Sequence, residues 1–318
     1  MSSSVLRPPQ RYANSLKNRY VAVVGDSIIS GTTTGVGYYD QIPSFLGQLL
    51  YKRGCCAVCR NFGISGQRTD EMLARINQIF RRDFGTPDLV VLEGGSNDYN
   101  FNSGTAQANI TLYMTAMVKY LKAGAKGYVT NPSSLPANGN LGDYYVVTVD
   151  NDSTGGFNPD SGQSGAGGNA CTLWKCTGVQ GGIKGWGRAN TPSTWVVPKI
   201  VIMNKHFLNF SGSGDNYSPT AVNSESVIIN TAVHNVCVNE DVLEGDIWTW
   251  LANRIASGEF TYQDWTSWHC ADGDIHPSAQ GCNLFAQYLD ELIADQTDWV
   301  TDLSKPKTAN TIRLPLAY

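Results

Sequence analysis

The sequence has little histidine, little net charge and no long apolar run. Its 318 residues include four histidines, and the formal net charge is -4 at pH 7. Such a charge argues against nucleic acid or an anionic membrane as a partner, because both attract basic surfaces. No apolar run approaches the roughly 20 residues that span a bilayer, and residues 1–10 lack the apolar core of a signal peptide. The sequence therefore predicts no membrane span, and no export by the general route unless a leader was removed.

The eight cysteines do not form a recognisable metal site. Zinc sites use two closely spaced pairs of ligands, whereas Cys171 and Cys176 have no second pair of cysteine or histidine near them in the sequence. We therefore expect no metal and no cofactor. Buried free thiols are the default, although Cys171 with Cys176, or Cys270 with Cys282, could pair in an oxidising compartment.

One serine follows directly after an apolar, β-branched run. Residues 20–24 read Tyr-Val-Ala-Val-Val and continue into Gly25-Asp26-Ser27. The run predicts a buried strand, and in an open parallel sheet the reactive groups collect at the carboxyl ends of the strands. Ser27 is therefore the candidate nucleophile, although Gly-Asp-Ser taken alone is also common in turns.

Three further stretches supply partners for this serine. Gly66 lies after an expected strand at 57–60, and its backbone N–H could reach a substrate oxygen without a side chain in the way. Asn97 follows an expected strand at 89–92 and carries an amide that could donate to the same oxygen. His276 lies just before the last amphipathic segment with carboxylates nearby, which is what a serine needs for activation.

In this order the four stretches resemble the SGNH, or GDSL, hydrolase superfamily, which is named after a serine, a glycine, an asparagine and a histidine in separate blocks. The resemblance covers about residues 18–126 and 199–296. It implies a three-layer α/β/α sandwich around a short parallel sheet, and ester hydrolysis through an acyl-enzyme. The oxyanion would be held by the N–H groups of Ser27 and Gly66 and by the amide of Asn97. No complete Gly-x-Ser-x-Gly elbow occurs in the sequence, which argues against an ordinary α/β-hydrolase.

The third member of the catalytic triad is ambiguous. By the resemblance, a carboxylate is expected three residues before His276, but that position is Gly273, with Asp272 and Asp274 on either side. We favour Asp272, interpreting the loop as Asp-Gly-Ile-His-Pro with one residue inserted. Asp274 is the alternative, and so is a Ser-His dyad steadied by a backbone carbonyl. His269 is the nearest rival to His276 as the base.

Apolar periodicity predicts helices between the expected strands. The stripes with helical spacing run through residues 42–50, 72–80, 110–121 and 284–293. A further strand is expected at 199–208, so that helices and strands alternate and the sheet should be parallel. His206 and His234 then fall in a strand and a helix as structural residues.

Residues 127–198 interrupt this alternation. Gly, Asn, Ser and Thr dominate residues 131–169, and short β-like runs occur at 144–149, 172–175 and 194–197. This composition predicts a small all-β module. Because it follows a helix, the module should begin at the amino ends of the strands, far from Ser27, unless it folds around an edge of the sheet. The expected organisation is an N-terminal extension at 1–17, a discontinuous hydrolase domain at 18–126 and 199–300, the inserted module at 127–198, and a tail at 301–318.

The insert has a resemblance of its own. Residues 132–147 are similar to a short element common in bacteriophage tail-fibre and tailspike proteins, where Leu-Pro and Gly-Asp precede a strand. Trp174, Trp186 and Trp195 form either the module's core or an exposed platform that binds sugar rings.

We accordingly predict a serine esterase that removes acetyl groups from a bacterial surface polysaccharide. The alternatives are a short-chain lipase or thioesterase of the same superfamily, or a catalytically weak, glycan-binding virion adhesin. The expected partner is an acetylated polysaccharide or another small ester. A homo-oligomer or a phage virion tail is the expected assembly, and the tail is the one location that the sequence suggests.

Overall fold

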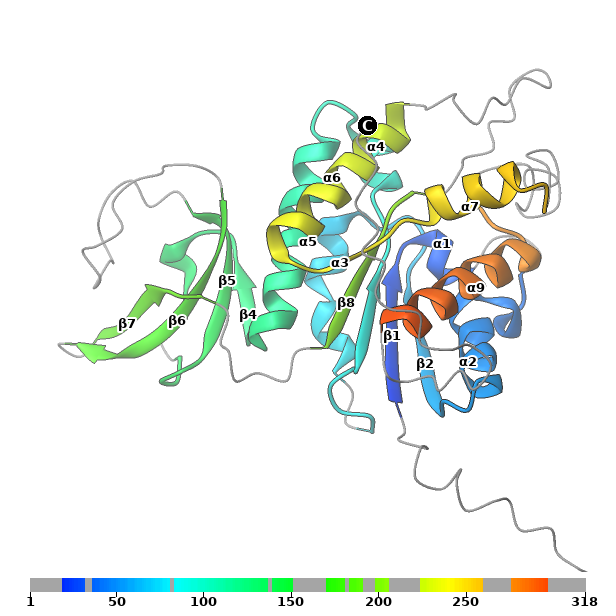
Figure 1. Ribbon diagram of the computed structural model, residues 1–318. Helices are drawn as coiled ribbons and strands as arrows, with labels where there is room; N and C mark the ends of the chain where they lie inside the picture. The colour runs from blue at the N-terminus through cyan, green and yellow to red at the C-terminus, as the bar shows by residue number, and fades with distance from the viewer. Residues whose placement is uncertain are drawn as a thin grey trace, which may run out of the picture.

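The part of the chain that the structure describes forms two β-sheets, with helices around the larger one (Figure 1). The computed structural model describes residues 19–31, 36–80, 83–136, 139–150, 170–180, 183–190, 198–205, 224–259 and 276–296. The main sheet has the strand order β2-β1-β3-β8-β9, and every neighbouring pair is parallel. The second sheet has the order β4-β5-β6-β7, with β4 and β5 parallel and the other pairs antiparallel.

The strands of the main sheet are short and mostly apolar. They are β1 (Arg19–Gly25), β2 (Ala57–Gly63), β3 (Leu89–Leu92), β8 (Lys199–Met203) and β9 (Leu243–Gly245). All of β3, and all of β1 after its first residue, is buried, as expected for a sheet covered on both faces. Gly25 pairs with Gly63, and Val24 pairs with Leu92, so β1, β2 and β3 end side by side.

Helices cover both faces of the main sheet. Alternate residues of β1 enter two different core clusters, with Ala22 and Val24 in one and Val21 and Val23 in the other. The first cluster includes residues of α3 (Thr69–Ala74), α5 (Ala106–Ala123) and α6 (Ser224–Glu240). The second includes residues of α2 (Ile42–Lys52), α7 (Ile247–Ala256) and α9 (Ala279–Gln296). The expected α/β sandwich with a parallel sheet is thus confirmed.

Most of the expected elements of this sandwich are present. The stripes at 42–50, 110–121 and 284–293 lie in α2, α5 and α9. The stripe at 72–80 is divided, because α3 ends at Ala74 and a 3-10 helix, η3, spans Ile76–Ile79. The N–H of Arg75 donates to the Met72 carbonyl three residues back, at 3.2 Å, which is the tighter 3-10 spacing. The strand expected at 199–208 ends at Met203, and its last residues, with His206, lie outside the described ranges.

The second sheet comes from the interrupting segment. Its strands are β4 (Gly127–Val129), β5 (Tyr144–Asp150), β6 (Ala170–Gln180) and β7 (Ile183–Arg188). Val146 and Leu173 pack in the same cluster as α5, so α5 lies between the two sheets (Figure 1). Two of the expected runs fall in β5 and β6, and the third, 194–197, lies outside the described residues. The sequence did not predict the three-residue strands β4 and β9, or β7, which has glycines at alternate positions.

Trp174 and Trp186 form the core of the second sheet rather than an exposed platform. Their side chains are 1% and 4% exposed. The indole N–H of Trp186 donates to the Pro136 carbonyl at 3.1 Å, and its ring meets Tyr145 edge-on. The expectation that these two residues contact substrate is therefore corrected, because their buried rings offer no face to a sugar. Trp195 lies outside the described residues.

The remaining composition-based expectations can be compared with the described residues alone. Cys171 and Cys176 are free, whereas Cys270 lies outside the described ranges. Among the described helices none is long and apolar enough to cross a membrane. In the same part of the chain no group of three or more His, Cys, Asp or Glu side chains is arranged to hold a metal ion.

Candidate active site

Ser27 begins a single helical turn at the carboxyl end of β1. Asp26 caps this turn, α1 (Ser27–Ser30), because its Oδ1 accepts a hydrogen bond from the N–H of Ile28 at 2.9 Å. Gly31 closes the turn in the left-handed conformation, and its N–H donates to the Ser27 carbonyl at 3.1 Å. The backbone on both sides of the nucleophile candidate is thus fixed, and Ser27 itself is 7% exposed.

His276 reaches this serine from the other end of the chain. Its Nε2 lies 3.0 Å from the Oγ of Ser27, although the two residues are 249 positions apart. This is a hydrogen-bonding distance, and it joins a hydroxyl to a ring nitrogen that can take its proton. Asp272, Asp274 and the rival base His269 lie outside the described residues, so the choice of triad carboxylate stays a prediction.

Gly66 lies in a turn that is tied to the end of β1. The N–H of Ile64, just before this turn, donates to the Gly25 carbonyl at 3.0 Å. Gly66 has a φ of +80°, a conformation that side chains disfavour, so the backbone and not the space around it requires glycine. Gly63 is required for the opposite reason, because a Cβ there would lie 2.2 Å from the backbone nitrogen of Ser30.

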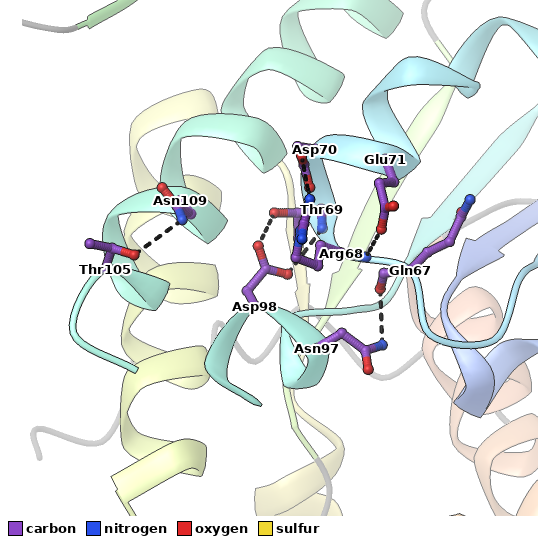
Figure 2. A network of polar contacts seen from close by, with 9 residues as sticks. All are labelled: Gln67, Arg68, Thr69, Asp70, Glu71, Asn97, Asp98, Thr105 and Asn109. Carbon is purple, nitrogen blue, oxygen red and sulfur yellow. Dashed lines mark hydrogen bonds and ion pairs between the residues drawn. The ribbon is translucent and has the colours of Figure 1, made fainter. Parts of the chain in front are cut away.

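Asn97 connects the Gly66 turn with the nucleophile turn. It is the second residue of α4 (Ser96–Phe101), which follows β3. Its Nδ2 donates to the Gln67 carbonyl at 3.0 Å (Figure 2) and to Oδ2 of Asp26 at 3.3 Å. The structure therefore brings Ser27 and His276 together directly. It links Asn97 to Ser27 through Asp26, and to Gly66 through Gln67, which are the neighbours of those residues in the chain.

Asp98, the next residue of α4, connects this helix with the start of α3, as Figure 2 shows. Its carboxylate is 3% exposed and accepts hydrogen bonds from the hydroxyl of Thr69 at 2.7 Å and from the N–H of Thr69 at 3.0 Å. Burial raises the pKa of the Asp98 carboxyl, and the two bonds to Thr69 oppose that rise. Asn97 thus ties α4 to the nucleophile turn and to the Gly66 turn, and Asp98 ties α4 to Thr69, three residues after Gly66.

Arg75 fixes the ends of two strands and is a residue that sequence reasoning missed. The side chain is buried, and its guanidinium donates to the carbonyls of Gly25 at 2.9 Å and Phe62 at 2.5 Å, and to the side chain of Gln67. Burial lowers the pKa of this guanidinium. The available signal was a positively charged residue shortly after Gly66, inside the segment 72–80 whose apolar residues have helical spacing.

Three charged side chains beside the nucleophile were also given no role. Asp26, Glu93 and Lys205 are 0%, 3% and 1% exposed. Glu93 comes directly after β3, and Lys205 comes two residues after β8. The carboxyl-end argument that selected Ser27 applies equally to these positions. Their charge at the ends of apolar runs was the available signal.

The comparisons with known proteins gave one family match and several similar solved structures. Residues 23–155 match the model of the GDSL-like Lipase/Acylhydrolase family, a range that contains Ser27, Gly66 and Asn97 and ends before His276. A comparison with curated protein sequences gave no match. Similar solved structures include a lipase/acylhydrolase from Enterococcus faecalis, with 12% identity, a TM-score of 0.48, and coverage of 86% of this chain and 95% of that one. An acetylxylan esterase from Geobacillus stearothermophilus has 14% identity and a TM-score of 0.47, with 91% and 99% of the two chains covered.

Proposed function

We propose that this chain, whose residues 23–155 match the GDSL-like Lipase/Acylhydrolase family, hydrolyses carboxylic esters through an acyl-enzyme on Ser27. The observation that carries the proposal is the 3.0 Å contact between Nε2 of His276 and Oγ of Ser27. His276 takes the proton as Oγ attacks the acyl carbon, and then gives it to the leaving alcohol. The same imidazole next activates the water that releases the acid and restores the serine.

The oxyanion formed in each step is held by the N–H groups of Ser27 and Gly66 and by Nδ2 of Asn97. The bond from Asn97 to Asp26 is long, at 3.3 Å, so an oxyanion at Ser27 can share that hydrogen. Removing one such donor typically costs a hundredfold to a thousandfold, or about 2.7–4 kcal/mol, in transition-state stabilisation.

The proposed substrate is an O-acetyl group on a bacterial surface polysaccharide. Exposed aromatic rings support a sugar substrate, since such faces stack on sugar rings. Tyr38 and Tyr39, in the segment that follows β1 and α1, are 65% and 77% exposed, and Phe101, at the end of α4, is 73% exposed. The guanidinium of Arg68 lies 4.3 Å from the centre of the Phe101 ring and adds hydrogen-bond donors there.

A first experiment tests the chemistry by comparing Ser27→Ala with the unaltered protein on p-nitrophenyl acetate. The matched control is Ser257→Ala, because Ser257 is exposed beyond α7 and its hydroxyl donates to the Arg254 carbonyl at 2.9 Å. We expect turnover to disappear in Ser27→Ala alone. Unchanged turnover in Ser27→Ala would contradict the esterase and leave the glycan-binding adhesin as the better interpretation.

A second experiment tests the substrate by measuring acetate released from a panel of acetylated bacterial polysaccharides, again with Ser27→Ala as the control. Chain-length preference is measured in parallel with p-nitrophenyl acetate and p-nitrophenyl octanoate. Release of acetate from a polysaccharide supports the deacetylase. Faster cleavage of the octanoate, with no release from any polysaccharide, would favour the lipase or thioesterase alternative.

A further inference from the structure

Lys205 is a buried lysine at the carboxyl end of β8, on the same side of the main sheet as Ser27 at the carboxyl end of β1. It follows β8, its side chain is 1% exposed, and it is among the largest fully buried side chains of the described residues. Removing an ammonium from water costs several kcal/mol unless opposite charge and hydrogen bonds compensate. Its surroundings must therefore supply that compensation.

Two buried carboxyl groups, of Asp26 and Glu93, lie close enough to this ammonium for its charge to affect their pKa values. Burial raises the pKa of the Asp26 carboxyl, whereas Lys205, Glu93, the N–H of Ile28 and His276 lower it. Burial also raises the pKa of Glu93 well above its usual range, the charge of Asp26 raises it further, and Lys205 opposes both effects. The charge of Lys205 therefore favours the ionised form of both carboxyl groups, whereas the charge of Asp26 disfavours the ionisation of Glu93.

The contacts of this group lead to the catalytic atoms. Asp26 caps the turn of Ser27 through Oδ1, and its Oδ2 accepts from Nδ2 of Asn97. Nζ of Lys205 contacts the hydroxyl of Ser96, the residue before Asn97. The backbone N–H of Lys205 donates to the side-chain carbonyl of Asn230 on α6 at 2.7 Å, which fixes the residue from its other side. The ammonium thus touches the start of α4 and attracts the carboxylate that holds the Asn97 amide.

We propose that Lys205 is a positioning residue for ester hydrolysis: its ammonium holds Ser96 and attracts Asp26, so that Asn97 presents its amide to the oxyanion. The proposal rests on the esterase function of Ser27. Lys205 touches neither the substrate nor the reacting atoms, and its effect is transmitted through Asp26 and Asn97. It should therefore influence kcat more than KM.

The test is Lys205→Met, which keeps the length of the side chain and removes the charge. The control is Lys199→Met, since Lys199 is exposed at the opposite end of β8. With p-nitrophenyl acetate we expect kcat of Lys205→Met to fall roughly tenfold to a hundredfold, which is less than the loss of a whole oxyanion donor, with KM within about twofold. The acid limb of the kcat/KM profile should move to higher pH, because Asp26 without its cation takes up a proton more readily.

A double variant, Lys205→Met with Asp26→Asn, keeps the test decisive if the single variant does not fold. It removes the cation and the anion together, a change that proteins often tolerate, so the double variant should melt close to the unaltered protein. We expect its kcat to stay low and its acid limb to return to the unaltered position, because Asp26 can no longer titrate.

The two proposals fail in distinguishable ways. An unaltered protein without activity, or with activity that survives Ser27→Ala, contradicts the esterase itself. The positioning role is overturned if the unaltered protein shows Ser27-dependent activity and Lys205→Met has the same kcat and pH profile as Lys199→Met. Wild-type kcat in the double variant overturns it as well.

Discussion

The carboxyl-end edge of the main sheet and the core of the second sheet bury polar atoms in opposite ways. At the edge, Asp26, Glu93 and Lys205 are withdrawn from water as charged or titratable groups. In the second sheet the buried polar atoms of Trp174 and Trp186 are indole N–H groups, which donate to a threonine hydroxyl and to a backbone carbonyl. Burying hydrogen-bonded indole N–H groups costs little free energy. Burying charged groups lowers the free energy of unfolding, and we attribute their presence at the active site to their role in positioning catalytic residues.

This difference teaches where function and stability should separate. Substitutions of Ser27, Asn97 and the carboxylate that orients His276 should change the rate of hydrolysis with a modest effect on folding. Substitutions in the second sheet's core should do the reverse. A variant that mixes the two effects would break the comparison.

The largest rate effect is expected at the carboxylate that orients His276. Asp272→Asn should lower kcat by up to about 10⁴-fold, because an amide in place of the carboxylate favours the wrong tautomer of the imidazole. Asp274→Asn is the matched control and should cost less. The reverse order, measured with p-nitrophenyl acetate, would assign the role to Asp274, and small losses in both variants would favour the Ser-His dyad.

Asn97→Ala should follow, with kcat reduced roughly a hundredfold to a thousandfold by the loss of an oxyanion donor. Asn109→Ala is a suitable control, since the side chain of Asn109 on α5 makes a local contact of 3.4 Å to Thr105 (Figure 2). Kinetics with p-nitrophenyl acetate and a thermal melt check the pair. Equal kcat in both variants would remove Asn97 from the oxyanion hole.

Residues that act at the ends of apolar runs could be predicted from the sequence. Ser27, Asn97 and the parallel sheet follow from strand-end chemistry and apolar alternation, and the structure places Nε2 of His276 at hydrogen-bonding distance from Oγ of Ser27. The same argument reaches Glu93 and Lys205, but a charge after a strand is ordinarily solvated. Only packing shows that these two are buried.

The burial of Trp186 and the contacts of Arg75 depend on residues far away in the sequence, and the spacing of apolar residues gives no information about such contacts. The buried position of Trp186 requires the Pro136 carbonyl and the Tyr145 ring, which lie 50 and 41 positions earlier in the sequence. A tryptophan in a polar, glycine-rich segment has the same local sequence whether it is a core residue or a sugar platform. Arg75 likewise interrupts a helical stripe, because its backbone and side chain are set by contacts with other elements.

Trp186→Ala should leave the rate nearly unchanged and lower stability. Removing this buried indole should cost about 3–5 kcal/mol of unfolding free energy through lost burial and a cavity. Urea unfolding measures the loss, and p-nitrophenyl acetate turnover below the melting temperature should stay within about twofold. A rate loss like that of Asn97→Ala would show that the second sheet supports the active site, contrary to the comparison.

The smallest expected effect is the contribution of Glu93 to the pH dependence of the unfolding free energy. Because Glu93 has a raised pKa in the folded protein, its stabilising contribution is complete below its usual value of 4.5 and is lost as the pH rises through the folded value. While the folded state holds one more proton than the unfolded state, the unfolding free energy falls by about 1.4 kcal/mol per pH unit.

Glu93→Gln keeps a hydrogen-bond donor toward Asp26 but cannot titrate. Its melting temperature should therefore fall less than that of the unaltered protein between about pH 5 and pH 7, where glutamate at its usual pKa would be ionised. Glu259→Gln, at an exposed residue paired with Arg254, is the control and should follow the unaltered curve. Parallel curves for all three proteins would mean that Glu93 holds no extra proton in the folded state. Asp26 and Glu93 would then both be negatively charged in the folded protein, beside the buried ammonium of Lys205 that lowers the pKa of both.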